Sequence, residues 1–263
     1  MNEWYKRQRG RDDEARALSE SLLGPEAEAF QEAMAVMARC LGIVSTSDWA
    51  GSLPMRRKIQ YASYAFNLLW SAWDSMLAGR YNSAAQLERS IDDSSDFLMA
   101  LYANPSLADE IPATTKDVYK ARRTIRNFLD RGGKGTGTEW LNRREREATS
   151  HQPYGHVSHE TTTHLPVTVE EGTKVAYVRP GGFVAEPTLR IHACGLGAAA
   201  GAMMPVLVLS FSDIAEVDAM WGELPEICRR HQKAISEQLE GFEYPAGEVD
   251  FLAFLSSDDE VTR

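Results

Sequence analysis

Apolar residues recur at helical spacing through the first half of this chain. Pro25 begins an apolar-rich stretch whose first turn is acidic, which suits the positive end of a helix dipole. Residues 57–80 carry apolar side chains on most sides, as a helix buried in a bundle does. Residues 82–102 show a single apolar stripe whose opposite face is predicted to be solvated, and a further helix is predicted from a cap at Thr114 or Thr115 to about Arg131. This pattern predicts a multi-helix bundle.

The pattern changes after residue 165. Two β-branched and aromatic runs, VTV and VAYV, flank the polar turn EEGTK and predict a short hairpin near residues 166–179. A long apolar segment follows. Ser212 is then a suitable N-cap for a further helix, which is interrupted near Pro225. The predicted fold class is therefore mainly α, a multi-helix bundle with a small β-hairpin inserted before the C-terminal helices.

Composition divides the chain into three parts. Residues 1–24 are predicted to be a charged N-terminal segment with a short helix beginning near Ala15. Residues 25–243 form a single helical domain that includes the hairpin. Residues 244–263 form an acidic C-terminal tail that we expect to be loosely held.

The balance of charged and apolar residues indicates a soluble protein. The net charge is -10, and the three cysteines are far apart without metal-binding spacing, which favours reduced thiols and a cytoplasmic location. Residues 193–211 contain no charge and approach the ~20 residues of a membrane span. Gly and Ala make up much of this segment and gain little from lipid, so we expect a buried, tightly packed segment and no membrane partner.

Two glycine-rich stretches invite a nucleotide-binding interpretation. Residues 132–137 (GGKGTG) lack the preceding strand of a P-loop and the Ser or Thr after Lys134, so they predict a flexible hinge. Residues 195–201 (GLGAAAG) have the spacing GxGxxxG, not GxGxxG, and predict close packing of a buried helix. We therefore predict no cofactor.

Four of the six histidines lie within fourteen residues, at His151, His156, His159 and His164. The run HETTTH has one residue more than the zinc-binding HExxH motif, so its two imidazoles would not share a helix face. His156 and His159 are three residues apart and would bind one ion only with a distant third ligand. Surface or hydrogen-bonded histidines are the simpler interpretation, and no metal is predicted.

The region 116–147 is strongly basic. It contains ten basic and five acidic side chains, whereas the whole chain has a net charge of -10. Such asymmetry predicts a face that binds an anion, either RNA or an acidic protein. The candidate contacts to phosphate or RNA are Arg122, Arg123, Arg126, Lys134 and Arg143.

Arg146 and His151 form an R-x4-H pair, and Arg144 forms R-x6-H with the same histidine. In a helical bundle this resembles the motif of HEPN domains, whose R-x4–6-H pairs act in metal-independent RNA cleavage. The resemblance implies that His151 moves a proton and that an arginine stabilises charge on the phosphate. HEPN nucleases usually have a small polar residue after the arginine, whereas Glu145 and Glu147 stand here. On a continuous helix Arg144 shares a face with His151, and Arg146 does not.

A second resemblance covers about residues 61–164. The segment GRYNSAAQLERS is similar to a G-x-Y-x-x-A-x-x-x-x-R-S helix of uncharacterised bacterial helical proteins, where it precedes a segment containing Ser and His. This resemblance implies no known activity.

Two functions remain open from the sequence. The first is a non-enzymatic cytoplasmic binding or scaffold module, in which the basic face 116–146 meets RNA or an acidic protein. The alternative is a HEPN-like endoribonuclease of a toxin or phage-defence system that uses Arg144, Arg146 and His151. Because one chain offers one motif, that active site would be completed by a second copy in a homodimer.

Overall fold

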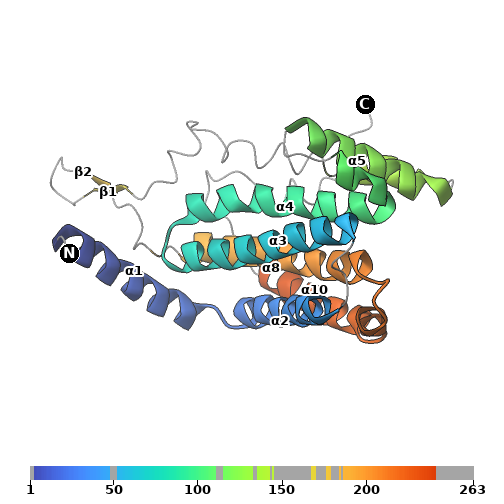
Figure 1. The fold of residues 1–263 in the computed structure, drawn as a ribbon. Helices are drawn as coiled ribbons and strands as arrows, with labels where there is room; N and C mark the ends of the chain where they lie inside the picture. Colours follow the sequence, from blue (N-terminus) through green and yellow to red (C-terminus); the bar gives the residue numbers. More distant parts are fainter. Residues whose placement is uncertain are drawn as a thin grey trace, which may run out of the picture.

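A computed structural model describes residues 3–47, 52–110, 115–132, 135–142, 144, 167–169, 176–178, 184 and 186–240. Within these residues the fold is mainly α, as the periodicity predicts (Figure 1). The helices are α1 (Glu3–Leu22), α2 (Pro25–Thr46), α3 (Leu53–Leu77), α4 (Tyr81–Ala103), α5 (Thr115–Leu129), α8 (Glu186–Ser210), α9 (Ala215–Asp218) and α10 (Leu224–Glu240). Short 3-10 turns lie at Pro105–Asp109, Asp130–Gly132 and Ala219–Gly222.

Two three-residue strands lie between α5 and α8 in the sequence. Strand β1 (Val167–Val169) pairs antiparallel with β2 (Ala176–Val178), and Val167 lies opposite Val178. The connection between the strands and the segments that flank them lie outside the described residues. The insertion of a hairpin near 166–179 into the bundle therefore stays a prediction.

Helix α8 occupies the centre of the bundle, where it contacts α2, α3, α4 and α10. Its inward side chains, among them Leu196, Met203 and Leu207, are almost fully buried. Among the described residues α8 alone is long and apolar enough to cross a membrane, and 56% of its most apolar window is buried inside the protein. The uncharged segment 193–211 is thus packed against other helices, as a core helix is.

The small residues of α8 allow α10 to approach closely. A Cβ atom on Gly201 would lie 2.5 Å from the ring of His231, and one on Gly197 would lie 2.6 Å from Cδ1 of Ile235. The His231 ring is buried, with Nδ1 3.1 Å from the Ala29 carbonyl oxygen and Nε2 2.7 Å from that of Gly197. GLGAAAG therefore serves helix packing, as predicted, and it lies inside helix α8, not at the strand-to-helix turn that a dinucleotide-binding loop occupies.

Helix α1 is longer than the sequence predicts, because it begins at Glu3 and not near Ala15. Its buried residues, Asp12, Ala15 and Ser19, are mostly polar or small. The Ser19 hydroxyl donates to the Leu77 carbonyl oxygen at 3.0 Å, which fixes α1 to the end of α3. An apolar periodicity cannot reveal a helix that is attached through such polar contacts.

Near the C-terminal helices the predicted Ser212 cap is wrong, whereas the predicted interruption near Pro225 is confirmed, because α9 ends at Asp218 and α10 begins at Leu224. Ser212 does not cap a following helix, because its hydroxyl donates back to the Leu209 carbonyl oxygen at 2.9 Å, at the end of α8. Helix α9 begins at Ala215, and Pro225 lies in the first turn of α10, where a missing N–H breaks no helical hydrogen bond.

Two buried thiols make the stability of this core depend on pH. Burial raises the pKa of Cys40 from 9.0 to about 12, against the opposing charge of Arg39. Burial, aided by Glu26, likewise raises the pKa of Cys194 to about 12. Between pH 9.0 and 12 the unfolded chain loses protons that the native state keeps, so the free energy of unfolding falls as pH rises, by up to about 1.4 kcal/mol per pH unit for each thiol.

We expect the double variant Cys40→Ala/Cys194→Ala to lose less stability than the parent protein between pH 8 and pH 10.5. Urea unfolding followed by circular dichroism at both pH values measures this difference. The substitutions also remove packing contacts, but this loss is the same at every pH. The compared quantity is therefore the slope of the free energy of unfolding against pH. Equal slopes in the two proteins would contradict the assignment.

Candidate functional site

The basic helix α5 is held on the bundle by an apolar stripe. Ala121 and Ile125 are fully or nearly fully buried in a cluster with Leu101 and Leu107, and the Phe128 ring meets that of Tyr102 edge to face at 5.8 Å. The stripe follows the three-to-four residue spacing of the sequence, so one face of α5 is fixed against α4 and the other faces outward.

A network of buried charges lies between α4 and the residues that follow it. Asp96, 1% exposed, accepts from Nε of Arg122 at 2.7 Å and from Nε of Arg144 at 3.0 Å. Arg122 also donates through Nη2 to Asp93 at 3.3 Å. Arg144 donates through Nη1 to the Asp92 carboxylate at 3.0 Å and through Nη2 to the Asp92 carbonyl oxygen at 3.2 Å. We call these five residues the Arg–Asp network.

Burial shapes the protonation of this network. It raises the pKa of Asp93, and the neighbouring Asp96 adds to the rise, while the charge of Arg122 opposes it. Desolvated carboxylates of this kind are stable only beside cations that also donate hydrogen bonds to them. The network therefore has a structural role: both arginine side chains donate hydrogen bonds to aspartates of α4 and so connect α5 and Arg144 to that helix.

The polar face of α4 was predicted to be solvated, and this prediction is wrong for Asp96 and Ser94, which are 1% and 3% exposed. The charged residues do recur at helical spacing, but α5 and Arg144 cover them. A helix face of charged residues has the same sequence pattern whether water or other ionised side chains lie against it, so periodicity alone could not distinguish the two cases.

Arg122 and Arg144 are the two predicted site residues that the structure brings together. Only 8% of the Arg122 side chain and 17% of the Arg144 side chain are exposed, so both face aspartates and not the surface. Arg144 thereby ties the chain beyond residue 142 to the middle of α4. The predicted residues Arg123 and Arg126 lie on α5, whereas Lys134, Arg143, Arg146 and His151 lie outside the described residues, as do His156, His159 and His164.

Residues 135–137 of the glycine loop after α5 form a turn; the flexible hinge predicted for residues 132–137 stays a prediction, and residues 133–134 lie outside the described residues. Gly135 has φ +68°, a conformation that favours glycine, and a Cβ atom on Gly137 would lie 2.2 Å from the Arg126 carbonyl oxygen. The Gly137 N–H donates to Oδ1 of Asp130 at 2.8 Å. This turn begins the helical residues 136–142, which lead to Arg144.

The outward side of α5 carries the exposed part of the basic region. Tyr119 is 68% exposed, and Lys120 and Arg123 are exposed beside it. Lys120 forms an ion pair with Glu110, and Arg126 donates through Nη2 to the Asn127 side chain at 2.9 Å. No carboxylate in the described part of the chain pairs with Arg123. We call Tyr119, Lys120, Arg123, Arg126 and Asn127 the α5 outer face.

Among the described residues no group of three His, Cys, Asp or Glu side chains is arranged to hold a metal ion. Comparison of the chain with protein-family models, with curated proteins and with solved structures gives no match. A function for this protein is therefore argued from the side chains of the chain itself.

Proposed function

We propose that this protein is a cytoplasmic binding module that holds an anionic partner on the α5 outer face. The observation that supports this proposal is a helix with two unlike sides. Its inner side is fixed by Ile125 and by the buried Arg122, and its outer side presents Arg123, Arg126 and the exposed ring of Tyr119. Cations next to an exposed aromatic ring bind phosphate groups and carboxylates, and the ring adds contact area at little entropic cost.

The engagement of Arg144 favours binding over catalysis. A phosphate-stabilising arginine needs donors that face the substrate, whereas Arg144 directs Nε and both Nη atoms to Asp92 and Asp96. A HEPN-like endoribonuclease would then depend on Arg146 and His151 across a homodimer, and it remains the alternative proposal. The proposed module carries the predicted hairpin near 166–179 beside the bundle and requires no metal or membrane.

A direct binding measurement tests the α5 outer face. We expect Arg123→Glu/Tyr119→Ala to weaken binding of the full-length protein to a fluorescent polyanion by about tenfold or more, because a repelling charge replaces an attracting one. Fluorescence anisotropy at fixed salt is measured with two probes, a single-stranded RNA and a poly-glutamate peptide. The probe whose binding is lost identifies the partner class.

A matched control and a cleavage assay complete this experiment. Arg229→Glu reverses an exposed charge on α10, with 70% of the side chain exposed, and should leave binding nearly unchanged. Equal losses in both variants, or none in either, would contradict the proposal. RNA cleavage in EDTA by the parent protein, abolished by His151→Ala, would replace the binding module with the nuclease.

A further inference from the structure

The N-terminal half of α1 projects from the bundle (Figure 1). The buried residues of α1 are Asp12, Ala15 and Ser19, so the helix is anchored to the bundle through its second half. Arg80 forms an ion pair with Asp12, and Arg16 donates through Nη2 to Asp74 at 2.8 Å. These contacts hold residues 3–11 as an ordered helix with most of its surface exposed.

This projecting half is basic and aromatic. Residues 3–11 contain four basic side chains and one acidic one, and the acidic one, Glu3, accepts from Lys6 at 3.2 Å. Arg7, Arg9 and Arg11 are exposed, and no carboxylate in the described part of the chain pairs with them. Trp4 is 64% exposed and Tyr5 is 51% exposed. Exposed indole and phenol rings beside unpaired guanidinium groups are unusual on a protein of net charge -10.

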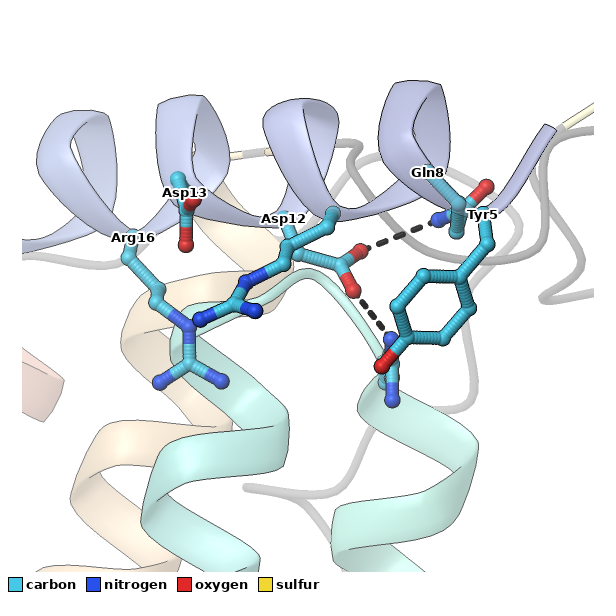
Figure 2. A pocket seen from close by; sticks show the side chains of 7 residues that line it. Tyr5, Gln8, Asp12, Asp13 and Arg16 are labelled. Atoms are coloured by element: carbon cyan, nitrogen blue, oxygen red, sulfur yellow. Dashed lines mark hydrogen bonds and ion pairs between the residues drawn. The ribbon is translucent and has the colours of Figure 1, made fainter. Parts of the chain in front are cut away.

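The side chains lie in two rows along the helix. Trp4, Arg7 and Arg11 follow one row and line a surface pocket of about 310 Å³ together with Gln8. Figure 2 shows Tyr5, Gln8, Asp12 and Arg16 projecting from the same side of α1. On that side Asp12 accepts from Gln8 at 3.0 Å and forms an ion pair with Arg80, so the charge of Asp12 is balanced by Arg80 and does not cancel that of the first row.

We propose that the row Trp4–Arg7–Arg11 is a binding surface for single-stranded RNA, with a base stacked on Trp4 and phosphates held by the two arginines. Arg7 and Arg11 are one turn apart, about 6 Å along the helix, so their side chains reach successive anionic groups. Base stacking on an aromatic ring combined with basic side chains is how proteins hold single strands without reading sequence.

The chemistry of the row favours RNA over other anionic partners. A membrane surface needs a continuous apolar stripe on the helix, and residues 3–11 supply only Trp4 and Tyr5. An acidic peptide would use the arginines, but its carboxylates gain little from the partly negative face of an exposed indole. This surface is distinct from the α5 outer face, since α1 and α5 lie at opposite ends of the bundle (Figure 1).

The test uses the full-length protein and a fluorescent single-stranded RNA of mixed sequence, followed by anisotropy across a salt series. We expect Trp4→Ala to raise Kd by about 5- to 150-fold, the range for one lost base stack. We expect Arg7→Ala/Arg11→Ala to raise Kd as well and to reduce the slope of log Kd against log salt by about 0.7 for each phosphate contact removed. Lys233→Ala, at a side chain 73% exposed on α10, is the control and should change neither quantity.

The outcomes separate this surface from the α5 outer face. Loss of RNA binding in the α1 variants, with binding retained in Arg123→Glu/Tyr119→Ala, supports the α1 surface even if the α5 proposal fails. Unchanged Kd in Trp4→Ala overturns the RNA assignment. If Arg7→Ala/Arg11→Ala weakens binding to RNA and to poly-glutamate equally, and Trp4→Ala changes the Kd of neither probe, the surface binds an acidic peptide instead. Circular dichroism confirms that each variant keeps its helical content.

Discussion

Replacing Asp96 with alanine is expected to lower the free energy of unfolding by about 3–5 kcal/mol. Asp96 accepts from both Arg122 and Arg144, and its removal leaves Nε of the buried Arg122 without its acceptor and the guanidinium with only the 3.3 Å contact to Asp93. Breaking a buried ion pair from one side costs more than the pair contributes, because the remaining charge has neither water nor a full set of partners. Urea unfolding at pH 7 measures the change.

A matched surface substitution provides the control. Asp109 is exposed, so Asp109→Ala should change the free energy of unfolding by less than about 0.5 kcal/mol. In the double variant Asp96→Leu/Arg122→Met the apolar side chains replace both partners, and the loss should be smaller than for Asp96→Ala. If Asp96→Ala costs no more than Asp109→Ala, the Arg–Asp network does not hold α5 and Arg144 in place.

The second large loss of stability is expected from a substitution of Gly201. A methyl group there would lie 2.5 Å from the His231 ring, whose nitrogens lie 3.1 Å from the Ala29 carbonyl oxygen and 2.7 Å from that of Gly197. The ring cannot yield without losing these contacts, so we expect Gly201→Ala to destabilise the protein by about 1–3 kcal/mol, the usual cost of overpacking. Thermal and urea unfolding both measure this loss.

Gly42 offers the opposite case in the same kind of element. It lies in α2, and a Cβ atom there would meet nothing within 4 Å. Gly42→Ala should therefore stabilise the protein by about 0.5–1 kcal/mol, because alanine favours the helix and restricts the unfolded chain. If Gly42→Ala and Gly201→Ala change the free energy of unfolding in the same direction, close packing against His231 does not set Gly201 apart from Gly42.

The bundle could be predicted because apolar residues recur at helical spacing in its core helices. The stripe of Ala121 and Ile125 places α5 against α4, and the small residues of α8 correctly indicate a close helix pair. In both cases the burial of apolar or small side chains decides how the helices pack. The positions of such residues can be read from a single sequence.

The charged contacts could not be predicted in the same way. Asp96 and Arg122 are 26 residues apart, and Asp96 and Arg144 are 48 apart, so their pairing depends on how α5 and the turn at Gly135 are oriented. The same residues are compatible with solvated faces. For the same reason the polar anchoring of α1 gave no signal, and without a helix that begins at Glu3 the sequence does not place Trp4, Arg7 and Arg11 in one row.

The His231 contacts also bear on how this protein is made. They join α10 to the carbonyl of Ala29, 202 residues earlier in the chain, and α10 packs on both α2 and α8. Closing contacts over so long a separation carries a large loop entropy and slows folding. During synthesis α2 and α8 must therefore keep an open apolar groove until more than 230 residues have been translated. A chaperone that covers this groove would raise the yield of folded protein, and a frameshift before α10 would leave a product prone to degradation.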